Sequence, residues 1–515
     1  MKKVICGILM VLIVNAFLMP QNSEQNELSL KDAIVIALKN NLDLQVEMTN
    51  TEYYWNDLKV NKSIFIPTLE INGSTSATNT PSTSAFAGAD ITTNERSSLE
   101  FKLIQPLLLG GSIEFSLDNS RYETNSIYST INPSLTTIMT FSITQPLLKN
   151  FGILPTRKDI YIATNTYKKY KHQLRQTIIE LVYNVEEAYW NLVYAYQTLE
   201  ATKMSLKRSK DLLRQNEIKV KVGTAARIDI LEAQAEVASY ESQLIQAEQT
   251  IQITQENLKK ILNMSKIRGV LRPTDTPEVI KIATDFDNYL LEALQKRPDI
   301  ERTRLDLKNY NIYVKYFKNQ LLPSLDLTAS YYTTGQGGDQ LIFDVHPFYG
   351  GEIIDVMTKD IWKTWQDNIA NLYQNYSVAL RLSIPLSLSK EKAQLAQARI
   401  NLKRAFLELK NVENTIYSEV KEIIKEIESN LKLVDANQIA LNLEEQKLRA
   451  EEKKLSVGLS TNFQVLNFQR DYANAQTNAL KSIIDYNLSI AKMNKTLART
   501  FDYYHIKFTD FLNNK

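Results

Sequence analysis

Residues 177–224 read TIIELVYNVEEAYWNLVYAYQTLEATKMSLKRSKDLLRQNEIKVKVGT. Apolar side chains recur in this stretch at every seventh position: Ile178, Val185, Leu192, Leu199, Leu206, Leu213 and Val220. A strict seven-residue repeat keeps one apolar seam turned towards a partner helix, which is typical of a coiled coil. We expect a helix over about 156–222, roughly 100 Å long at 1.5 Å per residue. A compact domain does not need a helix of that length, so the pattern indicates a helix that spans a gap.

The same register occurs a second time, further along the chain. The second series consists of Val420, Ile427, Val434, Leu441, Leu448 and Leu455. Each series ends three residues before a glycine, Gly223 or Gly458, so the two superpose at an offset of 235 residues. Glycine adopts the left-handed conformation that caps a helix at no steric cost, so each glycine predicts a hairpin. The expected helices are 156–222 and 225–263 in the first hairpin, and 390–456 and 460–500 in the second.

A second repeat lies outside the helices. An offset of 256 takes residues 65–71 (FIPTLEI) onto residues 321–327 (LLPSLDL). The difference between the offsets, 256 minus 235, places 21 additional residues in the first copy. Repeats of this kind indicate two copies of one structural plan. The expected divisions are a first repeat over 24–263, a linker over 264–284, a second repeat over 285–505 and a C-terminal tail over 506–515.

Between the helices, apolar and polar residues alternate, which is typical of half-buried strands. We expect four strands within about 66–147, including an extra hairpin around Gly110 and Gly111, and two strands within about 322–387. Alternation alone fits a soluble sandwich equally well. Six strands are too few to enclose water, because even an eight-stranded barrel is filled by its own side chains. A membrane barrel would therefore need several copies of the chain.

Three segments, 80–96, 119–135 and 333–375, are expected to be long loops at the far ends of the strands. The third contains Phe343, Phe348, Trp362 and Trp365. These aromatic side chains suit an interfacial girdle, and they could equally pack loops.

Composition and motifs exclude several classes of protein. The chain of 515 residues has a formal net charge of +2, which argues against a nucleic-acid binder. One cysteine excludes an intramolecular disulfide framework, and three scattered histidines leave little for a histidine metal cage. Because Gly-rich phosphate loops and the hydrolase and metalloprotease motifs are absent from the sequence, we expect no enzyme, cofactor or metal.

The N-terminus has the pattern of a secretory signal peptide over about 1–23. A basic start, Met1-Lys2-Lys3, precedes an apolar run from Val4 to Met19. An N-terminal membrane anchor is the alternative, although the run is short for a spanning helix. The expectation is an exported protein.

Taken together, these features resemble the TolC-like outer membrane efflux proteins over about 28–505. The resemblance rests on the duplicated plan, on the paired tips and on the strand-closing motifs Gln145-Pro146-Leu147-Leu148 and Ile384-Pro385-Leu386. It implies a mixed α and β membrane protein in which three copies form a homotrimer. Their strands would share one outer-membrane β-barrel, joined to a long α-helical barrel in the periplasm.

The function implied by this resemblance is that of an exit duct in the outer membrane. Substrates would pass passively from an inner-membrane transporter and a periplasmic adaptor, and outer-membrane lipid would surround the barrel. The tip residues would contact the adaptor: Val222, Gly223, Thr224, Val457, Gly458 and Leu459. A type I protein-secretion duct is an alternative, and so is a non-transporting periplasmic coiled-coil protein.

The resemblance also implies residues that line the periplasmic entrance. The family commonly has Asp six residues after each tip glycine, and another three residues later in the second copy. Asp229 keeps the first acid, whereas Gln464 and Asn467 are neutral at the other two positions. We therefore expect an entrance that is less cation-selective than in acid-ringed relatives. Asp229 could equally be a solvated acid stabilised by the helix dipole.

Overall fold

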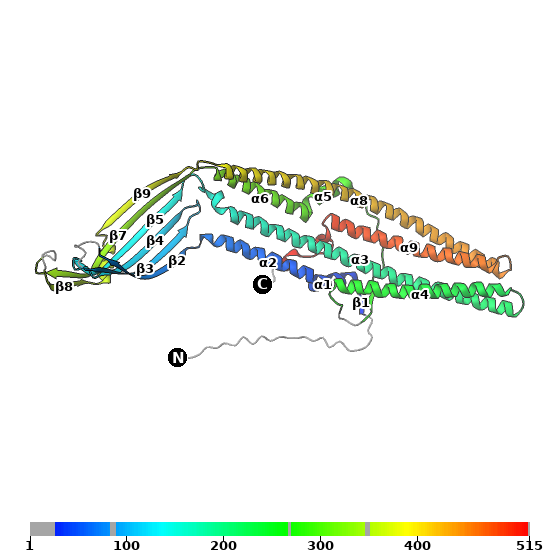
Figure 1. The fold of residues 1–515 in the computed structure, drawn as a ribbon. Coiled ribbons are helices and arrows are strands. Elements are labelled where there is room, and N and C mark those ends of the chain that lie inside the picture. The colour runs from blue at the N-terminus through cyan, green and yellow to red at the C-terminus, as the bar shows by residue number, and fades with distance from the viewer. Residues whose placement is uncertain (1–25, 83–88, 266–268, 346–350, 513–515) are drawn as a thin grey trace, which may run out of the picture. The chain divides into compact units, whose positions relative to one another are not determined.

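The computed structural model describes residues 26–82, 89–265, 269–345 and 351–512 (Figure 1). The expected signal peptide, Phe348 and the last three residues of the expected tail lie outside these ranges. The helices are α1 (Leu30–Asn40), α2 (Leu42–Lys62), α3 (Ile153–Lys221), α4 (Arg227–Ile261), α5 (Phe286–Lys296), α6 (Pro298–Gln320), α7 (Ile361–Ile369), α8 (Ser389–Ser456), α9 (Asn462–Thr496) and α10 (Thr500–Tyr503). The strands are β1 (Asn26–Leu28), β2 (Thr68–Pro81), β3 (Ile91–Pro106), β4 (Ser112–Thr124), β5 (Ile131–Pro146), β6 (Leu271–Pro273), β7 (Ser324–Phe343), β8 (Ile353–Lys359) and β9 (Gln374–Ser383).

The chain forms two compact units. We call the first the helical unit, and it comprises the described residues of Met1–Val46, Thr177–Lys296 and Tyr417–Lys515. The second, which we call the sheet unit, comprises the described residues of Glu47–Gln176 and Arg297–Ile416. Each unit takes segments from both sequence copies, so the units do not follow the repeat.

The two longest helices carry the heptad repeats. Helix α3 has 69 residues and α8 has 68, which gives each a length of roughly 100 Å. The heptad residues Ile178 and Val185 are fully buried in α3, and so is Val420 in α8. The seams therefore pack against neighbouring helices, as the seven-residue period requires.

The sheet unit contains an antiparallel sheet in the order β2-β3-β4-β5-β7, with β8 and β9 both paired to β7. Its strands extend from the ends of α2, α3, α6 and α8 (Figure 1). The extra hairpin, β3 and β4, is paired along its length between β2 and β5.

The expectation of six strands is wrong, because the sheet has a seventh strand, β8. A further parallel pair in the helical unit, β1 with β6, joins the start of the first copy to the linker that follows it. The seven residues of β8 and the three residues of each short strand are too few to give a clear alternation.

The expectation of long loops is also largely wrong. Strand β3 begins at Ile91, within 80–96, and β4 and β5 occupy both ends of 119–135. The segment 333–375 contains the end of β7, β8, α7 and the start of β9. The distal parts of these strands carry polar residues on both faces, so the alternation fades although the backbone ladder continues. Cross-strand hydroxyl pairs such as Ser74 with Ser98 (2.8 Å) and Thr75 with Ser97 (3.0 Å) lie on opposite faces of the same hairpin.

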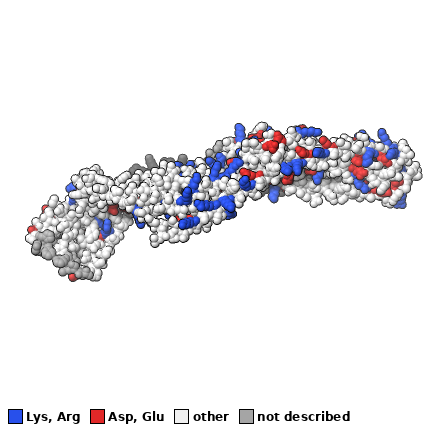
Figure 2. Space-filling view, turned by 90° about the horizontal axis from the view of Figure 1, so that it is seen from above, with Lys and Arg blue, Asp and Glu red and all other residues white. Residues whose placement is uncertain are grey.

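One face of the sheet is apolar, and we call its exposed large side chains the apolar belt. The pairing registers put them in lateral rows, such as Leu103–Phe115–Phe141–Tyr331–Tyr376. The belt consists of Leu69, Ile71, Leu99, Leu103, Phe115, Phe141, Tyr331, Tyr376, Val378, Leu380 and Leu382. Charged side chains are sparse over the sheet and dense over the helices on the face seen in Figure 2.

The opposite face of the sheet is polar. Lys102 and Glu114 form an ion pair there (2.9 Å), in a lateral neighbourhood that includes Glu70, Glu100 and Asp118. Both outermost strands are open. Every residue of β2 and of β9 is exposed, and within the described ranges β2 pairs only with β3 and β9 only with β7.

Within the described part of the chain, no helix combines the length and apolar character that crossing a bilayer requires.

Candidate functional site: the helix-hairpin tips

The first tip joins α3 to α4 through Gly223. This glycine has φ +78°, and its N–H donates to Val220 O (3.0 Å) while Thr224 N–H donates to Lys219 O (2.8 Å). These bonds satisfy the last carbonyl groups of α3. Asp229 then stabilises the start of α4, because its carboxylate accepts from the N–H of Ala226 (3.0 Å).

The second tip repeats this geometry. Gly458 has φ +80°, and Leu459 N–H donates to Lys454 O (2.9 Å). Helix α9 begins differently, because Thr461 is its N-cap and its hydroxyl oxygen accepts from Gln464 N–H (3.3 Å). The glycines therefore act as helix caps that permit the hairpin, as the sequence predicts.

Each tip exposes apolar side chains to solvent. Val222 is 66% exposed at the first tip, and Val457 and Leu459 are 68% and 77% exposed at the second. Ile228 and Phe463, which are equivalent under the offset of 235, are also exposed. Clustered apolar exposure of this kind is typical of surfaces that bind another protein.

A shared core holds the two hairpins together behind the tips. Leu212 of α3 packs with Leu448 of α8 and with Val465 and Leu466 of α9. Arg470 of α9 forms an ion pair with the largely buried Glu236 of α4 (3.2 Å). The tip residues of both copies are therefore parts of one packed assembly in the helical unit.

Sequence reasoning missed an exchange of carboxylate and amide between the tips. The offset of 235 pairs Asn216 with Glu451 and Asp229 with Gln464. In the first hairpin the buried Asn216 side chain donates to Asp229 O (3.2 Å). In the second, Glu451 accepts from the Ser460 hydroxyl (2.6 Å) and pairs with Lys454 (3.0 Å).

The acid therefore lies on the returning helix in the first tip and on the long helix in the second. The hydrogen bond from Ser460 makes the largest contribution to lowering the pKa of Glu451, and the hydrogen bond from Lys454 makes the next largest. The carboxylate is therefore ionised, and the ammonium group of Lys454 offsets its charge. The same offset that aligns the two glycines could have revealed this exchange.

The three residues that the sequence predicts at an entrance differ in exposure. Gln464 is exposed and lies 3.0 Å from the Ser460 hydroxyl, whereas Asn467 and Asp229 are partly buried. In the described ranges, no group of three or more His, Cys, Asp or Glu side chains is placed to hold a metal ion. The tips thus offer apolar contact and hydrogen bonding.

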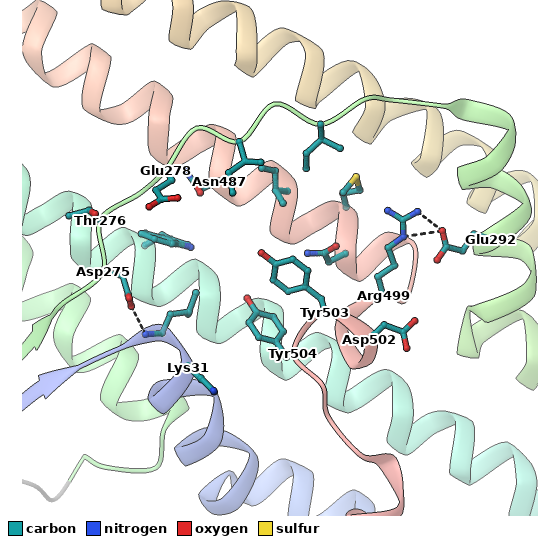
Figure 3. Close-up of a pocket in the computed structure, with 17 residues that line it drawn as sticks. Lys31, Asp275, Thr276, Glu278, Glu292, Asn487, Arg499, Asp502, Tyr503 and Tyr504 are labelled. Atoms are coloured by element: carbon teal, nitrogen blue, oxygen red, sulfur yellow. Dashed lines mark hydrogen bonds and ion pairs between the residues drawn. The ribbon is translucent and has the colours of Figure 1, made fainter.

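A cavity of about 800 Å³ lies elsewhere in the helical unit, between α1, the 275–282 segment, α5, α9 and α10 (Figure 3). Two of the acidic groups in its wall, Glu292 and Asp275, are held by partners from distant parts of the chain. Arg499 donates two hydrogen bonds to Glu292, at 2.9 and 2.5 Å, and Asp275 accepts from the N–H of Leu30 (2.7 Å). These pairs link distant segments of the chain, which favours a structural role for the cavity wall.

Glu186 of α3 is buried close to this cavity wall. Only 4% of its surface is exposed, and burial raises the pKa of its carboxyl group to about 7, opposed in part by a hydrogen bond with Tyr504. The heptad pattern does not predict the burial of this acid. Glu186 comes directly after the heptad residue Val185, at a position where the pattern predicts a side chain in contact with solvent.

Comparison with known proteins adds an independent result. The family model described as "Outer membrane efflux protein" matches residues 33–264 and 290–498. A curated relative, the probable outer membrane lipoprotein SilC of Salmonella typhimurium, is 22% identical over 282 residues. That match covers 47% of this chain and 59% of the relative, so it spans less than half of this chain and little more than half of the relative.

Solved structures show the same fold. The CmeC outer membrane channel of Campylobacter jejuni superposes with a TM-score of 0.62 at 16% identity, over 93% of this chain and 89% of that one. The MtrE outer membrane channel of Neisseria gonorrhoeae gives a TM-score of 0.61 at 18% identity, over 91% and 88%. Because the family model covers most of the sequence, the chain belongs to the outer membrane efflux protein family, whose members are outer membrane transport channels and not enzymes.

Proposed function

We propose that three copies of this chain form an exit duct through the outer membrane, which receives substrates from a periplasmic adaptor and an inner-membrane pump. Conduction through the duct would be passive, with the energy for transport supplied by the inner-membrane pump. The sheet unit forms one third of a barrel wall, and the helical unit carries the tips that meet the adaptor.

The observation that carries this proposal is the open, two-faced sheet. An edge strand with free N–H and C=O groups is a template for pairing, and proteins rarely leave one uncovered. Here β2 presents 14 residues and β9 presents 10, at opposite edges of a sheet that is apolar on one face and polar on the other. Joining β9 of one copy to β2 of the next would satisfy both edges and enclose the polar face.

Six strands of each copy, β2, β3, β4, β5, β7 and β9, would contribute to the wall along its length. The continuous pairing of β3 and β4 with their neighbours supports 18 strands in the trimer over 12. Strand β8 pairs only with the distal part of β7, so it would extend the rim.

Two observations support a role in efflux with an adaptor. The tips expose Val222, Val457 and Leu459, which suit a protein partner. The matching family is described as an efflux family, which favours small-molecule efflux over type I protein secretion and argues against a non-transporting coiled-coil protein. Deletion of the gene is expected to raise the amount of a small substrate that accumulates inside the cells. The set of proteins that the cells secrete should not change.

Intermolecular cross-linking tests the edge pairing directly. Cysteines introduced together at one position of β2 and one of β9, in a short scan along both strands, are expected to give a ladder that ends at three copies. The two single-cysteine variants are the matched controls, and neither should give more than a dimer. A double variant that forms only intramolecular disulfides would contradict the proposal.

A further inference from the structure

Helix α7 lies against the apolar face of the sheet, over the middle of β4, β5 and β7. Its Thr364 hydroxyl lies 2.8 Å from the Thr137 hydroxyl of β5, and Asn368 Nδ2 donates to Thr137 O (3.0 Å). Trp365 reaches a third strand, because its indole N–H donates to Asn119 Oδ1 of β4 (2.7 Å). Thr137 and Asn119 point to the same side as the belt residue Phe141.

The helix turns two polar side chains towards the sheet and its large apolar side chains towards solvent, where Lys363 and Gln366 are also exposed. Thr364 is fully buried and Asn368 is 4% exposed, whereas Trp362 and Ile369 are 66% and 76% exposed. Trp362 packs edge-on against Trp365, with ring centroids 5.6 Å apart. A helix in contact with water normally has the reverse arrangement, with its apolar stripe facing the protein.

Two glycines of β7 let the helix lie this close. A Cβ on Gly335 would come within 2.0 Å of Thr364 O, and one on Gly337 would come within 2.8 Å of Thr364 Cγ2. The bonds to Thr137 and Asn119 then fix the helix, so the outward position of its apolar side is built into the fold.

The exposed side of α7 continues the apolar belt. After the helix, Leu372 and Tyr373 are 60% and 58% exposed. Strand β9 follows them and carries the belt residues Tyr376 and Val378. The Tyr331 hydroxyl of the belt donates to Asn371 Oδ1 (2.5 Å) and so joins the belt to the end of α7.

We propose that α7 is an interfacial membrane helix, which lies on the outside of the sheet and inserts Trp362 and Ile369 among lipids of the outer leaflet. The boundary between acyl chains and head groups is where tryptophan is enriched in membrane proteins. Helices with one aromatic and apolar side lie in the plane of that boundary. The exposed ammonium group of Lys363 is beside Trp362 in the sequence and is suited to a lipid phosphate.

A second copy of the chain is a poorer candidate for the occupant of this surface. Helix α7 packs over β5 and β7 and reaches β4, which are interior strands, whereas a neighbouring copy would join at β2 and β9. Pairing at the edges would therefore leave the exposed side of α7 uncovered. This inference rests on the proposed function only in requiring that the sheet lies in a membrane.

Tryptophan quenching in proteoliposomes tests the proposal, because the chain has four tryptophans. One full-length variant keeps Trp362 alone (W55F/W190F/W365F), and a second keeps both Trp362 and Trp365 in case the loss of the Asn119 bond disturbs folding. The control keeps Trp55 alone, which is 40% exposed on α2. A belt probe carries L380W in a background without other tryptophans.

Phosphatidylcholine brominated near its head group is the membrane quencher, and acrylamide is the aqueous one. We expect bromine to remove most of the emission of Trp362 and of the L380W probe, and to leave Trp55 unchanged. Quenching of Trp362 by acrylamide alone, or by neither agent, while the L380W probe is quenched by bromine, would overturn the inference and leave the proposed function standing. A belt probe that bromine does not quench would instead contradict the membrane placement of the sheet.

Discussion

Glu186 is the buried acid that couples the helical unit to pH. Its pKa is about 7 in the folded chain against an ordinary value of 4.5, so the folded state holds a proton that the unfolded state releases. The sign follows: the folded state is favoured at low pH and loses stability as pH rises from 4.5 through 7. The shift corresponds to about 3 kcal/mol at most.

The variant Glu186→Gln is therefore expected to be the more stable protein at about pH 8 and to lose most of this pH dependence. Melting temperatures measured between about pH 5 and pH 8 check it. Glu187→Gln is the matched control, because Glu187 is exposed on the same turn of α3. Equal pH slopes for the wild type and Glu186→Gln would show that another group controls the stability.

We predict that the amides at the second tip, Gln464 and Asn467, lower the cation selectivity of the proposed entrance. Replacing Gln464 and Asn467 by Asp in all three copies would add six carboxylates, and focused negative charge attracts cations. The Q464D/N467D variant is expected to shift the reversal potential in a planar bilayer towards cation selectivity. The neutral variant Q464N is the control. A strongly cation-selective wild type would refute the prediction from the missing acids.

At the scale of elements, the contact between β7 and α7 depends on Gly335. A methyl group at this position would lie 2.0 Å from the Thr364 carbonyl oxygen, so Gly335→Ala must displace α7 from the sheet. We expect a loss of about 1–3 kcal/mol, as is usual for overpacking, and a change in the emission of a variant that keeps only Trp365. Gly73→Ala is the control, because its nearest neighbour would be Leu99 Cδ1 at 4.0 Å. An unchanged Trp365 spectrum would show that the helix tolerates the methyl group.

The long elements could be predicted from sequence because their patterns repeat over many residues. Seven-residue spacing extends from Ile178 to Val220, and the observed α3 ends at Lys221, before Gly223. Strand ends could not be predicted, because Thr, Ser and Asn on both faces beyond the belt erase the alternation. Helix α7 could not be predicted either, because it has only nine residues and its apolar side faces away from the protein.

The candidate site was predictable in part for the same reason. The offset of 235 aligns Gly223 with Gly458, and both occupy the expected left-handed caps. It also pairs Asn216 with Glu451, but the burial of these side chains depends on α4 and α9 folding back, which no local pattern reports.

At the scale of the whole molecule, the tips are expected to connect the duct to its adaptor. Leu459→Asp places a charge on a side chain that is 77% exposed, so it should leave assembly and conductance unchanged. Charge in the centre of a protein interface is costly, so efflux measured in cells should fall at least about tenfold. Leu459→Met keeps the apolar contact and should retain efflux. If the Leu459→Asp variant retains full efflux, this tip is not part of the interface with the adaptor.

The central claim is that one chain supplies a third of a closed wall. The mass of the purified full-length protein in detergent, corrected for bound detergent by light scattering, tests this most directly. The account predicts three copies in each particle, because only edge-to-edge joining satisfies β2 and β9 and encloses the polar face. A particle that contains a single copy would contradict it.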